Sequence, residues 1–127
     1  MRVFITDDFA KFMSKAWLSK ADIIQVATEV NSGLFDADLG GVLKKRIGAK
    51  GISKRDANRS IVALKRDDKI YFIDGWRKAD VSKTGKEIPD KLLDAYRLVG
   101  RSLLAANEQQ IQKDIQAGLL IEVVSER

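Results

Sequence analysis

The sequence has no cysteine, so a disulfide framework is excluded and a reducing compartment is expected. Histidine is also absent, which removes both the commonest zinc ligand and the commonest general base. No apolar run is long enough to span a membrane, and the opening MRVFITDDF has acids where a signal peptide has its apolar core. We therefore expect a cytoplasmic protein that contacts no membrane and holds neither a metal nor a small-molecule cofactor.

Charge is unevenly distributed along the chain. The 127 residues, 45% hydrophobic and 32% charged, suffice for one domain with a modest core. Residues 42–78 hold 12 Lys and Arg against 4 Asp and Glu, a local balance of +8. The other residues hold 11 cations against 14 acids, a balance of −3. A charge kept for solubility would be spread more evenly, so the middle third predicts a localised anion site.

The densest part of that region is LKKRIGAKGISKRDANR, residues 43–59, whose only acid is Asp56. Grouped like charges repel and cost stability unless an anionic partner docks. Any single lysine is more often surface charge, but the cluster as a whole favours contact with nucleic acid. Lys45 is expected to point away from its two neighbours, because adjacent strand positions face opposite sides. The seven cations are Lys44, Lys45, Arg46, Lys50, Lys54, Arg55 and Arg59.

The first third of the chain predicts one short strand and two helices. The strand is expected at residues 3–5. Ser19 and Asp22 resemble a capping pair that opens the second helix, and Gly33 can end it in the left-handed conformation. The first helix is expected to begin at an acidic cap, Asp7 or Asp8, and to bury one apolar face in the core: Phe9, Phe12, Met13 and Trp17.

The middle third predicts short strands at residues 42–47, 60–64 and 70–73, the last two joined as a hairpin. The apolar runs at 60–64 and 70–73 do not alternate with polar residues, so both faces of these two strands should be covered. The resulting order, β-α-α-β-β-β-α, predicts an α+β domain in which a small antiparallel β-sheet packs on helices.

The last third predicts a long helix, a shorter helix at residues 108–117, and an extended or apolar tail at 119–124. The start of the long helix has two candidates, a Thr84–Glu87 capping box or Pro89 at the first helical position. Gly100 lies inside the pattern and lowers helix propensity. The stripe that defines this helix is Ile88, Leu92, Tyr96, Val99 and Leu103.

Residues 40–80 read GGVLKKRIGAKGISKRDANRSIV and later YFIDGWRKAD. This stretch resembles the RelE/HigB-like toxins (RelE/ParE superfamily) of bacterial type II toxin–antitoxin systems. These toxins share a glycine-rich lead into a Lys-x-Arg strand, a basic glycine loop, an arginine opening the next strand, and an aromatic-x-Lys-x-Asp/Glu ending. The MRVFIT start and the AGLLIEV ending also match. The corresponding residues are Lys44 and Arg46; Lys50, Gly51 and Lys54; Arg59; and Trp76, Lys78 and Asp80.

The resemblance implies a microbial-RNase (RelE-like) fold over residues 1–127, with 108–127 as a C-terminal helix and tail extension. It also implies an endoribonuclease that cuts messenger RNA in the ribosomal decoding site and is neutralised by a cognate antitoxin. Two departures stand out. The loop SKRDANR has less glycine than its relatives, and Trp76 replaces a commoner tyrosine or phenylalanine, so no phenol is available there.

The chemistry of RNA cleavage assigns roles to these residues. Attack by the 2′-hydroxyl needs in-line geometry, removal of a proton and stabilisation of charge on the phosphorane. Arg46 and Arg59 are the candidate phosphate clamps, because a guanidinium meets two phosphate oxygens at once. Lys54 and Lys78 are the candidates for proton transfer, because neighbouring cations favour the neutral form of a lysine. The candidates for RNA contact are Lys44, Lys50, Arg55, Trp76 and Arg77.

Several alternatives stay open at this point. The chain could be a non-catalytic RNA- or ribosome-binding module on the same fold, or an interaction protein whose basic patch receives an acidic partner. Trp76 either stacks on a base or is a half-buried sheet aromatic. The long-helix stripe and residues 119–124 either contact the antitoxin or pack in the core. Asp67 and Asp68 are interpreted as turn residues rather than metal ligands.

Overall fold

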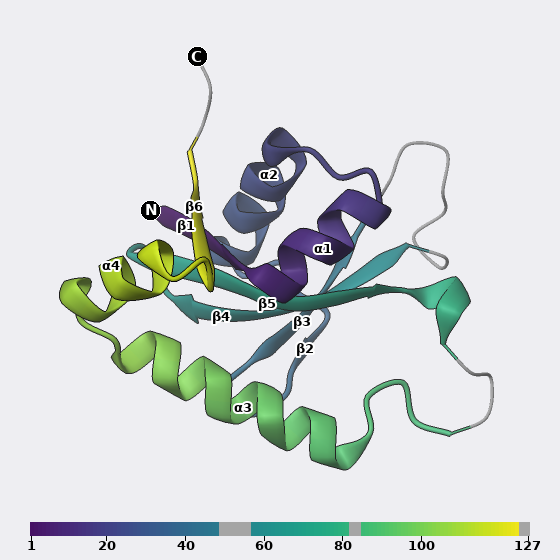
Figure 1. Cartoon of the computed structure of the whole chain (residues 1–127). Coiled ribbons are helices and arrows are strands. Elements are labelled where there is room, and N and C mark those ends of the chain that lie inside the picture. The colour runs from purple at the N-terminus through teal and green to yellow at the C-terminus, as the bar shows by residue number, and fades with distance from the viewer. Residues whose placement is uncertain (49–56, 82–84, 125–127) are drawn as a thin grey trace.

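The computed structural model describes residues 1–48, 57–81 and 85–124 of the chain. In these ranges, strands form one sheet in the order β2-β3-β4-β5-β1-β6 (Figure 1). Neighbouring strands are antiparallel except β1 and β5, which run parallel. The strands are β1 (Arg2–Thr6), β2 (Ala37–Asp38), β3 (Leu43–Ile47), β4 (Asn58–Lys65), β5 (Lys69–Arg77) and β6 (Leu120–Val123).

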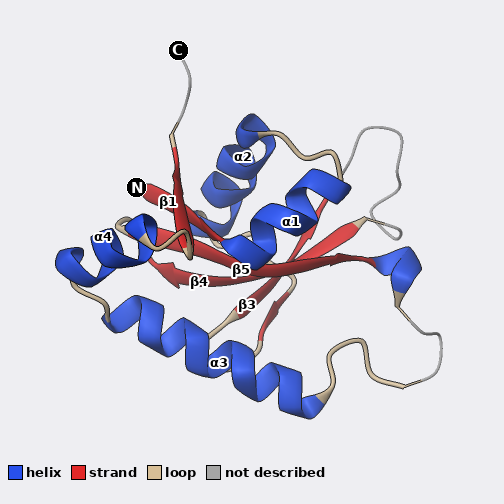
Figure 2. Ribbon diagram, viewed as in Figure 1, coloured by secondary structure: helices blue, strands red, loops and turns tan. Residues whose placement is uncertain are grey.

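Helices cover both faces of the sheet. In Figure 2, α1 and α2 lie on one side of the strands, and α3 and α4 lie on the other. The predicted α+β class is confirmed. Among the described residues, no helix combines the length and the apolar character that crossing a membrane would require. The helices are α1 (Asp7–Lys15), α2 (Lys20–Asn31), α3 (Asp90–Ala105) and α4 (Glu108–Gln116), with a short 3-10 turn, η2 (Lys78–Asp80).

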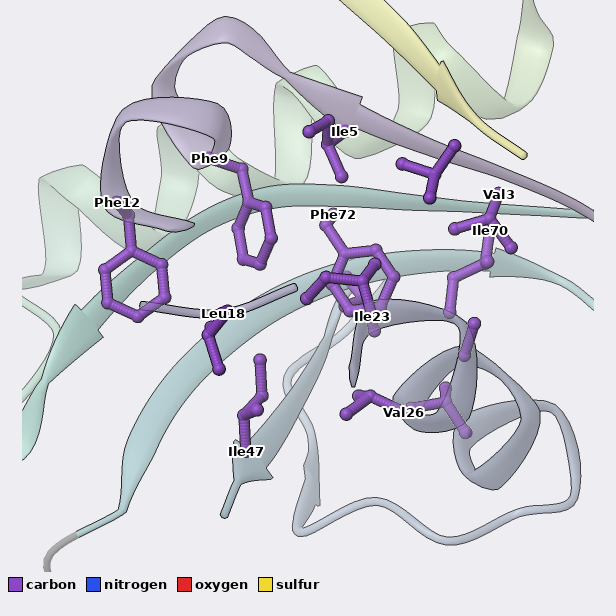
Figure 3. Close-up of a cluster of buried hydrophobic side chains, with 14 residues drawn as sticks. Val3, Ile5, Phe9, Phe12, Leu18, Ile23, Val26, Ile47, Ile70 and Phe72 are labelled. Carbon is purple, nitrogen blue, oxygen red and sulfur yellow. The ribbon is translucent and has the colours of Figure 1, made fainter. Parts of the chain in front are cut away.

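The sheet separates two apolar clusters. On the α1/α2 side, Phe9 lies 5.1 Å from Phe72 and 5.5 Å from Phe12, measured between ring centroids (Figure 3). On the α3/α4 side, Ile61 packs in a second buried cluster with Tyr96. Because strands β4 and β5 contribute to both clusters, the prediction that they are covered on both faces is confirmed. Full burial of each large apolar side chain contributes about 1.5–3 kcal/mol.

Side-chain caps start the first two helices. Thr6, rather than Asp7 or Asp8, caps α1: its Oγ1 accepts a hydrogen bond from the Phe9 amide at 3.1 Å. The acidic-cap prediction was therefore wrong, although both aspartates lie in the first turn, where the helix dipole favours anions. The Ser19–Asp22 capping box is confirmed, with reciprocal side-chain to backbone bonds of 3.1 and 2.8 Å.

Trp17 was predicted to lie in the core, but it is 93% exposed, so this prediction was wrong. Helix α1 ends at Lys15, and the backbone of Trp17 takes a left-handed φ of 58°. The helical periodicity therefore stops before Trp17, and the next residue, Leu18, enters the core instead. The predicted burial of Phe9 and Phe12 is confirmed.

The sheet is larger than the sequence pattern indicated. Strand β2 was not predicted, and the C-terminal apolar run forms β6, which pairs antiparallel with β1. The expectation of a purely antiparallel sheet fails at one pair, because β1 inserts between β5 and β6 and runs parallel to β5. Strand β5 extends to Arg77, so the hairpin is longer than its apolar residues alone predicted.

Helix α3 begins at Asp90, with Pro89 as its N-cap residue. Thr84, the alternative start, lies outside the described residues. The predicted stripe is only partly buried: Tyr96 enters the core, whereas Leu92 is 42% and Val99 39% exposed. The predicted helix at 108–117 is confirmed as α4, ending at Gln116.

Candidate nucleic-acid interface

Three strands place basic and aromatic side chains on the sheet face that α3 covers. Arg46 on β3 pairs with Arg59 on β4, and Arg59 pairs with Trp76 on β5. Lys44 lies two residues before Arg46, so it points to the same face. Trp76 packs against the apolar cluster beneath α3, which identifies that face. We call Lys44, Arg46, Arg59 and Trp76 the basic face.

Arg59 is the buried member of the basic face, with 1% of its side chain exposed. Its Nη1 donates a hydrogen bond to the carbonyl oxygen of Ala57 at 2.5 Å. Its Nε lies 3.8 Å from Oε2 of Glu87. A guanidinium keeps its charge in proteins, so burial requires polar partners of this kind.

Glu87 connects two cations of the basic face. Its Oε1 lies 3.3 Å from Nζ of Lys44, while its Oε2 faces Arg59. The Glu87 side chain is 25% exposed and that of Lys44 27%, so solvent screens this cluster less than it screens a surface pair. The sequence related Glu87 only to a helix cap and gave no functional signal for it.

Neighbouring positions on β3 face opposite sides of the sheet. Lys45 points to the α2 side, where its Nζ lies 3.0 Å from Oε1 of Glu29, which confirms its predicted separation from Lys44. Arg46, in contrast, borders the same α2-side cavity as Lys45 and Glu29. Arg46 is more exposed, and its Nε lies 3.7 Å from Oδ1 of Asp36. The other carboxylate oxygen of Asp36 accepts the Arg46 backbone N–H at 2.6 Å. Arg46 is thus the most accessible cation of the basic face.

The candidates after Trp76 lie at the end of β5. Arg77 donates two hydrogen bonds to the Asp80 carboxylate, at 2.9 and 3.1 Å, and this pairing raises the pKa of Arg77. Lys78 begins η2 and is half-buried. Arg77 borders a separate cavity of about 510 Å³ that Lys11 and Lys15 also line. Asp8, Asp74 and Asp80 line this cavity too, so Arg77 lies on a surface of mixed charge, one strand position beyond Trp76.

Three further candidates, Lys50, Lys54 and Arg55, lie outside the described residues. Ile47, the last residue of β3, pairs with Asn58, the first residue of β4. These strand ends lie one residue beyond the Arg46–Arg59 pair.

Residues 1–123 match the family described as the RelE toxin of the RelE / RelB toxin-antitoxin system. The chain belongs to the RelE toxin family. No curated protein matches this RelE-family chain. Membership makes the chain a toxin of the toxin–antitoxin type and implies an antitoxin as its partner.

Trp76 in this RelE-family toxin is partly buried and contacts the apolar cluster beneath α3. Its Nε1 is buried, and within the described ranges it has no hydrogen-bond partner. The ring also borders a cavity of about 330 Å³, which Glu87 and Leu92 help to line. Of the two sequence-based alternatives, the half-buried sheet aromatic describes this conformation, with one edge of the ring left at a cavity.

A partly buried hydrogen bond beside this cavity joins α3 to β5. The Tyr96 hydroxyl donates a hydrogen bond to Oδ2 of Asp74. Burial first, and then this hydrogen bond, raise the pKa of Tyr96, so its phenol stays neutral. The sequence pattern places Tyr96 only in an apolar stripe, because its partner Asp74 lies 22 residues away in another element.

The arrangement can bind phosphate and stabilise negative charge through grouped Lys and Arg side chains. Within residues 1–48, 57–81 and 85–124, no group of three or more Asp or Glu side chains is placed to hold a metal ion. The chemical groups that the basic face of this RelE-family toxin offers are therefore its cations, its aromatic ring and the neighbouring Glu87 carboxylate.

Proposed function

We propose that this RelE-family toxin is a metal-independent endoribonuclease that cuts messenger RNA on the ribosome in the cytoplasm. The observation that carries the proposal is the basic face, where Lys44, Arg46 and Arg59 share one side of the sheet with Trp76. Grouped cations of this kind bind the phosphates of an RNA strand, and that contribution dominates affinity. Residues 1–127 act as a single RelE-like domain that a cognate antitoxin neutralises.

Each candidate residue has a role set by its chemistry. Arg46 and Arg59 hold the scissile phosphate and stabilise the charge that develops on it. Lys54 and Lys78 move protons: one accepts the 2′-hydroxyl proton as that oxygen bonds to phosphorus, and the other protonates the departing 5′-oxygen. The residues proposed to contact RNA elsewhere are Lys44, Lys50, Arg55, Trp76 and Arg77.

Glu87 occupies the place of an anion on this face. Its carboxylate lies beside both Lys44 and Arg59, as a phosphate group would when bound. It balances their charge in the free protein, which lowers the repulsion that the grouped cations would otherwise cause. An RNA phosphate that binds Arg59 replaces Glu87 as its anionic partner.

The proposal is tested with purified ribosomes carrying a defined message. The wild-type chain should produce new 5′ ends in the ribosome-bound message, and its expression without an antitoxin should arrest bacterial growth. Arg46→Ala should slow cleavage about 10²-fold, as expected when one group that stabilises transition-state charge is removed. Arg46 is exposed, so its loss should leave the fold intact.

Lys45→Ala is the matched control, because Lys45 adjoins Arg46 in sequence but faces α2. This variant should cut the message at the wild-type rate. Equal losses in the two variants would contradict the proposed site. Absence of both growth arrest and cleavage by the wild-type chain would contradict the nuclease itself.

The burial of Arg59 favours one alternative, a non-catalytic RNA- or ribosome-binding module. Its guanidinium is 1% exposed and already faces Glu87, so this conformation does not present it to a phosphate. A binding module would protect ribosome-bound message from added nuclease without generating new ends. The cleavage assay therefore separates the two functions in one experiment.

A further inference from the structure

A second hollow lies on the α3 side of the sheet, and its chemistry is opposite to that of the basic face. This cavity of about 470 Å³ is lined by residues from α3, β5, the β1–α1 junction, the end of α4 and the start of β6. Apolar side chains form much of its lining: Leu92, Ala95, Val99 and Leu119. Four carboxylates line it as well: Asp7, Asp8, Asp74 and Asp114. We call this surface the acidic groove.

The apolar part of the acidic groove is not covered by the chain itself. Leu92, Val99 and Leu119 are 42%, 39% and 52% exposed. Two of them belong to the α3 stripe that the sequence predicted from its regular apolar spacing. Contiguous exposed apolar surface rimmed by polar groups is typical of interaction sites. Packing of α3 against the sheet therefore does not account for all of the apolar side chains in its stripe.

The acidic groove carries negative charge that ion pairs among the described residues do not neutralise. In the described part of the chain, Asp7, Asp8 and Asp114 form no ion pair. Asp7 and Asp8 benefit from the N-terminal dipole of α1, but Asp114 lies in the last turn of α4, where the dipole disfavours an anion. The acid at 114 therefore opposes local helix electrostatics, although the chain carries a net charge of +5.

We infer that the acidic groove binds an amphipathic, positively charged segment of a partner protein. Apolar side chains of that segment pack on Val99 and Leu119, and its Lys or Arg side chains pair with the aspartates. Charge complementarity selects this occupant, because the same carboxylates repel an RNA strand. The inference depends on the proposed function only where it identifies the partner as the antitoxin.

The groove continues toward the basic face. The cavity beside Trp76 and Glu87 shares Asp74, Leu92 and Tyr96 with the acidic groove. A segment seated in the groove that extends past Leu92 therefore arrives next to Trp76 and Glu87. By this path, a partner held mainly by the acidic groove covers one border of the RNA site without entering its centre.

Selection from a phage-displayed library of random peptides on the immobilised full chain tests the inference. A chain with net charge +5 would by default recover acidic peptides. The groove predicts the reverse: recovered peptides should combine apolar residues with an excess of Lys and Arg. Recovery of acidic peptides alone, or of none, would overturn the inference.

Two neighbouring residues of α3 supply the matched variants. Val99→Arg adds a cation inside the groove and should weaken binding of a recovered peptide at least about tenfold, or 1.4 kcal/mol. Leu98→Arg adds the same charge one position away, where the side chain is 62% exposed and does not line the groove, and should leave affinity unchanged. Asp114→Lys should weaken binding as Val99→Arg does, without loss of helix stability. Equal affinity of the Val99→Arg and wild-type chains would contradict the inference.

The outcomes separate this inference from the nuclease proposal. Peptide affinity is measured without RNA, so failure of message cleavage leaves the groove result unchanged. A dimer of this chain that Val99→Arg dissociates in sedimentation experiments would identify a second copy as the occupant, and would overturn the inferred basic partner.

Discussion

Gly75 and Gly100 show how single residues decide whether helices can approach the sheet. A Cβ at Gly75 would lie 2.3 Å from Cδ2 of Phe12, and a Cβ at Gly100 would lie 2.7 Å from Cγ1 of Val42. Neither glycine has a left-handed φ, so each is required for space. From the sequence, Gly100 is only a position of low helix propensity, because the contact with Val42 depends on tertiary packing.

Gly75→Ala should lower the free energy of unfolding by about 1–3 kcal/mol, because the added methyl group must displace the ring of Phe12. Urea denaturation followed by circular dichroism measures the change. Gly48→Ala is the control, since a Cβ there meets nothing within 4 Å and should change stability by less than about 0.5 kcal/mol. Equal stability of the Gly75→Ala and wild-type chains would show that Phe12 relocates freely.

Residue-level predictions about the site succeeded where they depended on strand geometry. The alternation of side chains along β3 correctly separates Lys45, paired with Glu29, from Lys44, paired with Glu87. Glu87 was missed, because it reaches Arg59 from a segment 28 residues later in the chain and belongs to no local pattern. The proton-transfer roles of Lys54 and Lys78 stay predictions.

At the scale of elements, local signals predicted most helices and strands, and failures occurred at their ends. Helix α1 stops two residues before Trp17, so periodicity extended past the helix end misplaced that side chain. The tail at 119–124 reads as a short apolar run in isolation. It becomes β6 only because β1 offers a pairing edge more than 100 residues away in sequence, which no local pattern contains.

Arg2 on β1 attaches both C-terminal elements to the sheet. Its guanidinium donates to Glu108 of α4 at 2.6 Å and to Glu122 of β6 at 2.9 and 3.0 Å. These hydrogen bonds lower the pKa of both carboxyls. A carboxyl with a lowered folded-state pKa stabilises the fold fully above its ordinary pKa, and this contribution is lost as the pH falls through the lowered value.

Arg2→Gln should therefore reduce stability at neutral pH and flatten the loss of stability on acidification. Urea denaturation at a series of pH values from neutral to acidic measures both effects. Arg101→Gln, which removes an exposed arginine from α3, should keep the wild-type pH dependence. If both variants keep the wild-type acid-side slope, the Arg2 pairs do not contribute to stability as described.

At the scale of the whole molecule, charges of opposite sign border one another on the α3 side of the sheet. The excess of cations in residues 42–78 predicted a localised anion site, and the fold groups Lys44, Arg46 and Arg59 on one face. The acidic groove could not be predicted in the same way, because its carboxylates come from three separate elements, α1, β5 and α4. Only folding brings them to one surface.

The central claim is that cations on the α3 face of the sheet bind the RNA backbone, and Lys44→Gln compared with Lys45→Gln tests it most directly. The two residues are adjacent but face opposite sides, and each pairs with a carboxylate, Lys44 with Glu87 and Lys45 with Glu29. Affinity for a short single-stranded RNA, measured at several salt concentrations, should fall for Lys44→Gln, with a salt slope smaller by about 0.7. Lys45→Gln should keep the wild-type affinity and slope, whereas equal losses in both variants, or a loss only in Lys45→Gln, would contradict the account.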